Sequence, residues 1–362
     1  MPIVKEVYLC TCINQKFKKM KKNLQNALLL AMGLMTTVTF AQDWDVDSRT
    51  RMDMSDADGD GNAVKSTDQR VTLGATWGGS DWGIHVSSDV NYTLGGAAAS
   101  MGIYEAYASA DLMGYATVTA GRQALNNGSG ALMSSNDWGA RTTWDGMTFD
   151  LGLDMADISV GYASMNTGTG ADDNGNMWVN ASGEFSGWNV NMLYMTEEGL
   201  HADGSAASEN AATGIDISGE VMGAGVSVSM NTDFNENTMR VIGLSYAVND
   251  DMGVNVSQTV YGEDGDFNMA GTNMDGSYGT TGNLGYLGSG SENLSYGLTY
   301  NMGGISMGAT MHNITNSADA TVDRSITEVS LGYSLGDNAG IGVSYAAEDD
   351  VKYTWLTLTV TP

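Results

Sequence analysis

The sequence contains little cysteine, proline or positive charge. Its two cysteines, Cys10 and Cys12, lie near the N-terminus, so the rest of the chain has neither a disulfide nor a cysteine for a lipid anchor. Only 15 basic residues accompany 43 acidic ones, which argues strongly against nucleic-acid binding. No run of about 18 apolar residues follows the N-terminal region, and this excludes membrane-spanning helices. Two prolines beside 48 glycines fit a large antiparallel barrel better than a soluble domain.

Residues 1–41 are predicted to be a leader that the mature protein lacks. Met20-Lys21-Lys22 supplies the basic start of a secretory signal peptide, 27–38 its apolar centre, and Thr39-Phe40-Ala41 the small residues before cleavage. A membrane-anchoring helix is the alternative, but the apolar segment is short for one. Residues 1–19 match nothing downstream, and we interpret them as a spurious extension ahead of a start at Met20.

The predicted mature chain, residues 42–362, is more acidic than the whole sequence. Nine basic and 42 acidic residues remain, which gives a net charge of −33. A surface with this charge concentrates cations and repels anions. We therefore expect any pore formed by this chain to prefer cations.

From Asp43 onward, apolar and polar residues alternate in short segments. In one of them the apolar positions are Val71, Leu73, Ala75 and Trp77. Period two with one apolar and one polar face indicates a β-strand. In a membrane barrel the apolar face meets lipid and the polar face meets a watery lumen. Eighteen segments show the pattern: 43–53, 70–77, 84–93, 103–112, 115–122, 139–151, 158–166, 177–185, 188–196, 215–222, 224–232, 238–248, 253–262, 293–302, 305–313, 324–335, 339–347 and 352–361.

The connections between these segments alternate between short turns and long loops. Short ones include GGSD, MGAG and GDNAG, and long ones include 55–67, 123–137 and 263–292. Outer-membrane barrels sort their connections in this way, with the short turns and both termini on the periplasmic side, whereas a soluble β-sandwich or β-helix does not. The predicted fold is an all-β, transmembrane antiparallel β-barrel of about 18 strands. Sixteen is the alternative, because Asp145-Gly146 breaks the alternation of its segment and is either a hairpin turn or a bulge.

The stretch at residues 121–150 organises the rest of the chain. It reads GRQALNNGSGALMSSNDWGARTTWDGMTFD, with a strand before it, a strand after it and a small, glycine-rich middle. An ordered loop of this length between strands is usually functional. The frame resembles the GRQ-loop-DW-R-DG segment of Gram-negative outer-membrane porins, including the alginate-export-like barrels. This resemblance, firmest over residues 115–151, implies that 124–136 folds into the barrel and narrows the pore.

The resemblance to diffusion porins also implies a basic wall that faces acidic residues across the narrowest point, where the transverse field sets selectivity. Our candidates for the constriction are Arg70, Arg122 and Arg141 on the basic side and Glu105, Asp111 and Asp137 facing them. Further predicted pore-lining residues are Arg49, Arg51, Asp89 and Arg324. An equally open interpretation is that these arginines only neutralise neighbouring lumen carboxylates.

Other polar clusters give weaker signals. Asp56, Asp58 and Asp60 with Gly61 begin like a calcium loop, but Thr67 stands where the pattern needs Glu. We interpret this segment as a solvated acidic loop, with weak calcium binding as the alternative and no other cofactor. Three histidines, His85, His201 and His312, have no spacing that suggests a catalytic group.

The sequence therefore predicts a porin of the bacterial outer membrane, not an enzyme, that lets small hydrophilic solutes and ions, cations above all, diffuse passively. Its expected partners are membrane lipid and these solutes, without nucleic acid, and a homotrimer is a further hypothesis. A saccharide- or polysaccharide-selective channel and a non-conducting structural barrel are the alternatives.

Overall fold

A computed structural model of the chain describes residues 41–56, 65–96, 98–137, 141–166, 175–199, 206–278 and 282–361. The predicted leader, apart from Ala41, lies outside the described residues, as do Asp58, Asp60 and His201. Within the described ranges no helix has the length and apolar character to cross a membrane. The barrel, which begins at Asp43 as a compact unit, is described by itself.

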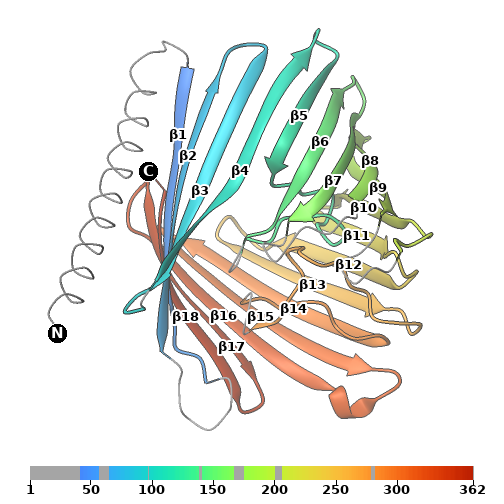
Figure 1. Cartoon of the computed structure of the whole chain (residues 1–362). Helices are drawn as coiled ribbons and strands as arrows, with labels where there is room; N and C mark the ends of the chain where they lie inside the picture. Colours follow the sequence, from blue (N-terminus) through green and yellow to red (C-terminus); the bar gives the residue numbers. More distant parts are fainter. Residues whose placement is uncertain are drawn as a thin grey trace, which may run out of the picture. The chain divides into compact units, whose positions relative to one another are not determined.

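The described residues form one antiparallel sheet of 18 strands (Figure 1). Its strands are β1 (Ala41–Asp53), β2 (Ser66–Gly78), β3 (Trp82–Thr93), β4 (Ala99–Leu112), β5 (Ala116–Gln123), β6 (Thr143–Gly152), β7 (Asp157–Asn166), β8 (Gly175–Phe185), β9 (Trp188–Glu198), β10 (Ala212–Val221), β11 (Ala224–Thr232), β12 (Thr238–Ala247), β13 (Met252–Tyr261), β14 (Ser291–Met302), β15 (Ile305–Asn316), β16 (Arg324–Ser334), β17 (Ala339–Glu348) and β18 (Val351–Val360). A 3₁₀ turn, η1 (Ala320–Val322), precedes β16.

The sheet closes on itself, which confirms the predicted barrel and its strand count. Each strand pairs with the next, and β1 pairs with β18 from Ser48 opposite Val360 to Asp53 opposite Trp355. Closure removes the free edges that an open sheet of this size would expose. Sixteen strands is wrong, because Asp145 and Gly146 lie within β6, with Asp145 paired to Arg122 on one side and Ser164 on the other.

Alternation along each strand separates the two faces of the wall. On β12 the side chains of Ile242, Leu244 and Tyr246 are exposed on the outer face, as are apolar side chains on most other strands. So many exposed apolar side chains fit a surface that lipid covers rather than water. Most connections alternate in length as predicted, although Asp349-Asp350 is a two-residue turn at the long-loop end.

Candidate pore constriction

The connection between β5 and β6, residues 124–142 and here called the constriction loop, crosses the interior of the barrel. Its tip contacts the wall at β10 and β11: the Ser129 amide donates to Asp216 Oδ2 at 3.0 Å, and Ser229 Oγ donates to Ser129 Oγ at 3.2 Å. Its far end contacts β1, β2 and β3 through Asp137 and Arg141. These two groups of strands lie on opposite sides of the closed sheet. The predicted inward fold of this loop is therefore confirmed.

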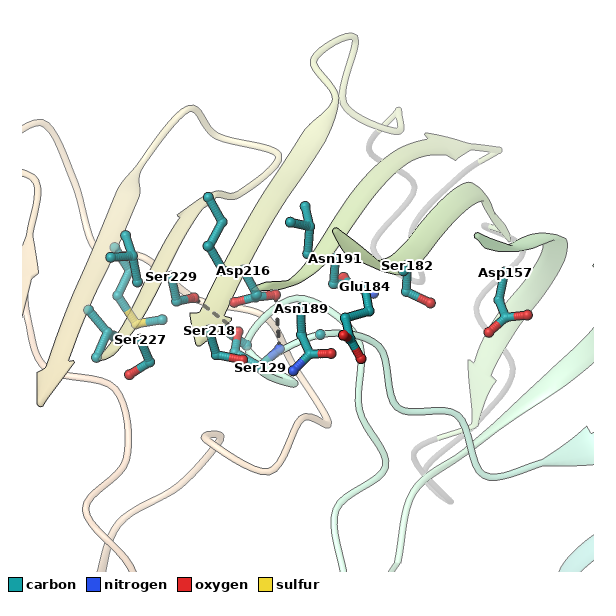
Figure 2. A pocket seen from close by; sticks show the side chains of 18 of the residues that line it. Ser129, Asp157, Ser182, Glu184, Asn189, Asn191, Asp216, Ser218, Ser227 and Ser229 are labelled. Carbon is teal, nitrogen blue, oxygen red and sulfur yellow. Dashed lines mark hydrogen bonds between the residues drawn. The ribbon is translucent and has the colours of Figure 1, made fainter. Parts of the chain in front are cut away.

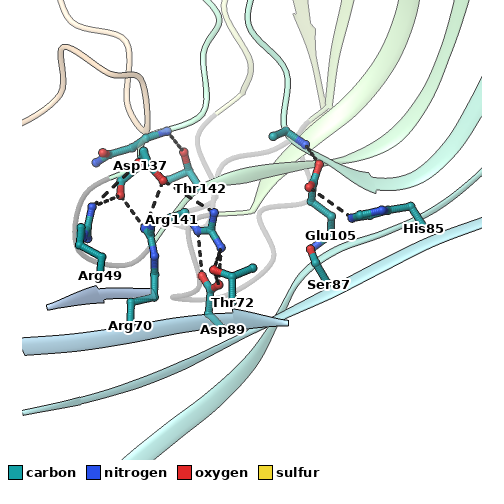
Figure 3. Close-up of polar contacts among 12 residues, drawn as sticks. Arg49, Arg70, Thr72, His85, Ser87, Asp89, Glu105, Asp137, Arg141 and Thr142 are labelled. Carbon is teal, nitrogen blue, oxygen red and sulfur yellow. Dashed lines mark hydrogen bonds and ion pairs between the residues drawn. The ribbon is translucent and has the colours of Figure 1, made fainter. Parts of the chain in front are cut away.

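Arg141 anchors the far end of the loop in a buried ion pair with Asp89 of β3 (Figure 3). Its Nε donates to Asp89 Oδ2 at 2.8 Å, and its Nη2 donates to Asp89 Oδ1 and to Thr72 Oγ1. The Arg141 and Asp89 side chains are 7% and 10% exposed, and the Arg141 guanidinium lies 3.4 Å from the ring centroid of Tyr104. Burial disfavours the charge, but the hydrogen bonding and charge of Asp89, together with the nearby Tyr104 and Asp137, outweigh burial and raise the pKa of Arg141 above its usual value.

Asp137 contacts two further arginines beside this pair. Arg70 Nη1 donates to the Asp137 carbonyl at 2.8 Å and to its Oδ1 at 3.1 Å. Arg49 Nη1 donates to the same carbonyl at 3.2 Å, and Arg141 Nη1 lies 3.7 Å from Asp137 Oδ1. Asp137 is 59% exposed while Arg70 is buried. The loop therefore presents a carboxylate to the lumen, with the guanidinium groups packed behind it.

A bulge in β4 brings Tyr104 and Glu105 to this region together. Ser87 pairs with Glu105 but Ser88 pairs with Ile103, so Tyr104 is an extra residue in the ladder. Glu105 Oε1 accepts a hydrogen bond from the Ala124 amide at 3.0 Å, and Glu105 Oε2 lies 3.6 Å from His85 Nε2. Glu105 therefore holds the first residue of the constriction loop against the wall.

A second loop, residues 262–290 between β13 and β14, packs against the constriction loop. Thr142 Oγ1 donates to the Gly271 carbonyl at 2.6 Å, and Tyr286 Oη donates to the Ala131 carbonyl at 2.6 Å. The two loops share an apolar core that includes Leu132, Met133, Phe267, Met269 and Leu287. Burial raises the pKa of the Tyr286 phenol. Among the described residues, the inner obstruction therefore consists of two loops.

The loop at 262–290 was not predicted to enter the lumen. A signal was present, because Phe267, Met269, Met274, Tyr278 and Leu287 make this loop unusually apolar for a segment exposed to water. The structure buries Phe267 and Tyr278 almost completely. Apolar composition in a long barrel loop thus indicates an inward fold.

Comparison with known proteins supports the fold alone. No known family and no curated protein matches the sequence. Among solved structures, OccD3 (OpdP) of Pseudomonas aeruginosa has a TM-score of 0.67 at 10% identity, with 90% of this chain and 92% of that chain covered. The outer membrane protein OpdK of the same organism has 0.70 at 11%, covering 89% and 98%. OccAB2 of Acinetobacter baumannii has 0.69 at 14%, covering 88% and 98%. These neighbours are 18-stranded outer-membrane porins and not enzymes.

This chain has the fold of a Gram-negative outer-membrane porin. Barrels of this fold lie in the bacterial outer membrane. The porin fold fixes which end of the barrel carries the short turns and which the long loops. It leaves the solute and the selectivity to the side chains of the lumen, since identities this low carry no substrate assignment.

The structure places Arg122 and Asp111 outside the constriction, contrary to our prediction. Arg122 forms its own ion pair with Asp145 at 2.8 Å. Asp145 lies on the same face of β6 as Met147 and Phe149, whose side chains are exposed on the outer face, and Arg122 stands opposite it on β5. The ion pair therefore lies on the outer wall. Asp111 lies at the β4–β5 turn, at the opposite end of the barrel, where its carboxylate accepts a hydrogen bond from the Gly114 amide at 2.8 Å.

The remaining predicted residues of the barrel lie at the inner wall away from the loop junction. Arg51 stacks on Trp355, 4.8 Å from the ring centroid. Arg324 pairs with Glu348 at 2.8 Å. Asp56 forms an isolated backbone bridge with Lys352, and no group of possible metal ligands occurs among the described residues. The calcium hypothesis rests on Asp58 and Asp60, outside the described residues, and stays a prediction.

A cavity of about 730 Å³ lies between the loop tip and the wall formed by β7 to β12 (Figure 2). Three carboxylates line it, those of Asp157, Glu184 and Asp216. The remaining polar side chains are amides and hydroxyls: Asn189, Asn191, Ser129, Ser182, Ser218, Ser227 and Ser229. This described lining contains no arginine, lysine or histidine. The barrel interior is thus acidic at the tip of the loop, whereas at its far end Arg49, Arg70 and Arg141 gather around Asp89 and Asp137.

Substituting Gly128 with alanine is expected to detach the loop tip from β10. A Cβ there would lie 2.0 Å from Asp216 Oδ2, and Gly128 has φ +58°. We expect noisier and larger single-channel currents in Gly128→Ala, measured in planar bilayers, because the tip loses its anchor. Gly95→Ala is the matched control, since Gly95 has φ +81° with nothing within 4 Å of a new Cβ. An equal increase in current noise in both variants would show that backbone strain, rather than loss of the Asp216 contact, causes the increase.

Proposed function

We propose that the protein is a porin that lets small hydrophilic solutes and ions diffuse passively across the outer membrane, with a preference for cations. The observation that carries this proposal is the constriction loop, which crosses the lumen from Arg141 at β3 to Ser129 at β10. A loop in this place narrows the passage without adding to the strand ladder. The proposal includes removal of residues 1–41 as a leader, and assembly as a homotrimer stays a prediction.

Charge placement along the barrel supports the cation preference. Each basic residue after residue 42 lies at the long-loop end, in a connection there or in the nearer half of its strand: Arg49, Arg51, Lys65, Arg70, Arg122, Arg141, Arg240, Arg324 and Lys352. The short-turn half carries carboxylates instead, such as Asp43, Asp45, Asp81, Asp154 and Asp251. At the constriction Arg70 pairs with Asp137 and Arg141 with Asp89. An ion therefore meets a net negative wall over much of its path.

Reversal potentials in a KCl gradient across a planar bilayer test this preference. We expect K⁺ to be favoured over Cl⁻ at low salt. The preference should shrink as salt rises, because the screening length falls to about 3 Å near 1 M. Asp137→Asn should weaken it more than Asp251→Asn, since Asp137 lies at the narrow point and Asp251 in a short turn. Anion selectivity at low salt would contradict the proposal.

A saccharide-selective channel is the second candidate, in line with the resemblance of residues 115–151 to alginate-export-like barrels. Such a channel needs aromatic faces that are free to stack on sugar rings. Tyr278, Tyr353 and Trp355 instead stack on one another, with centroids 5.6 and 5.8 Å apart, and Arg51 covers Trp355. Their faces are occupied within the protein and are not free to stack on a sugar ring, and this favours unselective diffusion. A non-conducting barrel is the third candidate, and the absence of KCl current would favour it.

A further inference from the structure

We propose that the cavity beneath the loop tip is a binding station for small diamines that lack a carboxylate. The inference deepens the proposed porin function and rests on it, since the cavity is reached through the lumen. Its polar groups come from β7 to β11 and from the loop tip, and in Figure 2 they lie in a row along the strands, with Asp157 at one end.

Two oxygen atoms at the cavity, Asp216 Oδ1 and Asn191 Oδ1, are buried and have no hydrogen-bond donor among the described residues. Asp216 Oδ2, in contrast, accepts from the Ser129 amide. Both groups face Gly128, because a Cβ on that glycine would lie 2.0 Å from Asp216 Oδ2 and 2.8 Å from Asn191 Oδ1. Buried acceptors require a donor, and an ammonium group offers three donors and no acceptor. The pair therefore selects a protonated amine.

Asp157 and Glu184 supply a second anionic point in the same cavity. Asp157 stands opposite Ser182 in the β7–β8 register, and Glu184 stands opposite Asn189 in the β8–β9 register. Neither carboxylate has a basic partner within ion-pair distance among the described residues. Two separated negative points favour a ligand with two positive ends.

The apolar side chains that line the cavity fit an alkyl chain. Ala131, Met239, Val241 and Met274 line the cavity; Ala131 and Met239 are fully buried, so the accessible apolar surface is that of the partly buried Val241 and Met274. Methylene groups gain free energy by covering such surface. A volume of about 730 Å³ accommodates an α,ω-diamine and is far larger than a dehydrated metal ion needs.

A ligand that also carries a carboxylate has no matching donor here. The described part of the cavity lining holds no cationic side chain, and the guanidinium groups of Arg70 and Arg141 are engaged by Asp137 and Asp89 across the lumen. A carboxylate in the cavity would lie beside three carboxylates of the protein, which is unfavourable. The geometry thus distinguishes a diamine from an amino acid of the same length.

Putrescine block of the K⁺ current tests the inference on the refolded mature barrel. We expect putrescine to reduce the single-channel current, and 4-aminobutyrate and 1,4-butanediol at the same concentration to leave it unchanged. In the double variant Asp157→Asn/Glu184→Gln, half-block should need roughly tenfold more putrescine or beyond, since charge-assisted hydrogen bonds are lost. Asp251→Asn in a short turn is the matched control and should be blocked like the parent.

The outcomes separate the two proposals. A barrel that conducts K⁺ selectively but is not blocked by putrescine overturns the binding station and leaves the porin function intact. Equal block of the parent and the double variant overturns it as well, as does equal block by 4-aminobutyrate. Absence of current, or anion selectivity, overturns the porin proposal itself. If the double variant fails to form a heat-modifiable barrel, Glu184→Gln alone gives the same comparison, because Glu184 is exposed and its loss leaves no unpaired buried group.

Discussion

Replacing residues 124–136 with a short Gly-Ser linker is expected to raise the single-channel conductance by about twofold or more, since conductance grows with the cross-section of the narrowest point. The loop spans the lumen between Asp216 on one wall and Asp89 on the other, so its removal opens the section that it now fills. The barrel should persist, because the loop contributes no pairing to the strand ladder. Planar-bilayer recordings on the refolded variant measure the change.

The control is a matching replacement of residues 317–323, which connect β15 and β16 at the long-loop end. That segment contacts Asn316 and, at the start of the 262–290 loop, Glu263, away from the contacts that this loop makes with Ala131 and Thr142, so its loss should leave conductance close to the parent value. Both variants should keep the mobility shift on heating that marks a folded barrel. A parent-like conductance after removal of 124–136 would show that the narrowest point lies elsewhere, with the 262–290 loop as the next place to examine.

Substituting Arg141 with alanine is expected to cost about 3–5 kcal/mol of stability, the loss typical when one member of a buried ion pair is removed. Among the described residues, Asp89 would then lie buried with only Thr72 Oγ1 as a donor. The half-exposed pair of Arg324 and Glu348 provides the comparison, since such pairs contribute less than about 1 kcal/mol. Urea unfolding in detergent, followed by tryptophan fluorescence, measures both variants.

A double variant separates the lost charge pairing from lost packing. Asp89→Asn/Arg141→Met leaves no unpaired charge, so it should recover much of the stability that Arg141→Ala loses. The introduced thioether side chain would still cover the ring of Tyr104, whose centroid now lies 3.4 Å from the guanidinium. Equal losses in Arg141→Ala and Arg324→Ala would contradict the assignment of Arg141 as the anchor of the loop.

The barrel could be predicted from the sequence because its physics is local. Side chains of a two-faced strand repeat with period two, so segments such as 224–232 and 305–313 show their structure within a few residues. Strand boundaries were harder to predict at residues 139–151, because β6 begins only at Thr143 and Arg141 belongs to the loop. The loop is joined to the wall by contacts between residues far apart in sequence, which no local pattern predicts.

The errors at the site have two different causes. Arg122 shares its face with Ala116, Val118 and Ala120, so strict alternation already places it on the outer wall. Asp111 shares the inner face with Glu105 but lies at the short-turn end, and depth along the barrel depends on the ladder rather than on alternation. Arg70, Arg141 and Asp137 do meet, which the charge types suggested, while the role of Asp89 as the buried partner of Arg141 required the three-dimensional arrangement.

The contacts that set the aperture join parts of the chain that are far apart in sequence. Neighbouring strands pair as hairpins, whereas Thr142 meets Gly271 and Ser129 meets Asp216 across the assembled interior. Loop closure over such separations is slow and gains nothing until the surrounding wall exists. During assembly the wall therefore precedes its aperture. A newly inserted barrel is expected to leak more than a mature one, until the two loops dock and the passage takes its final width.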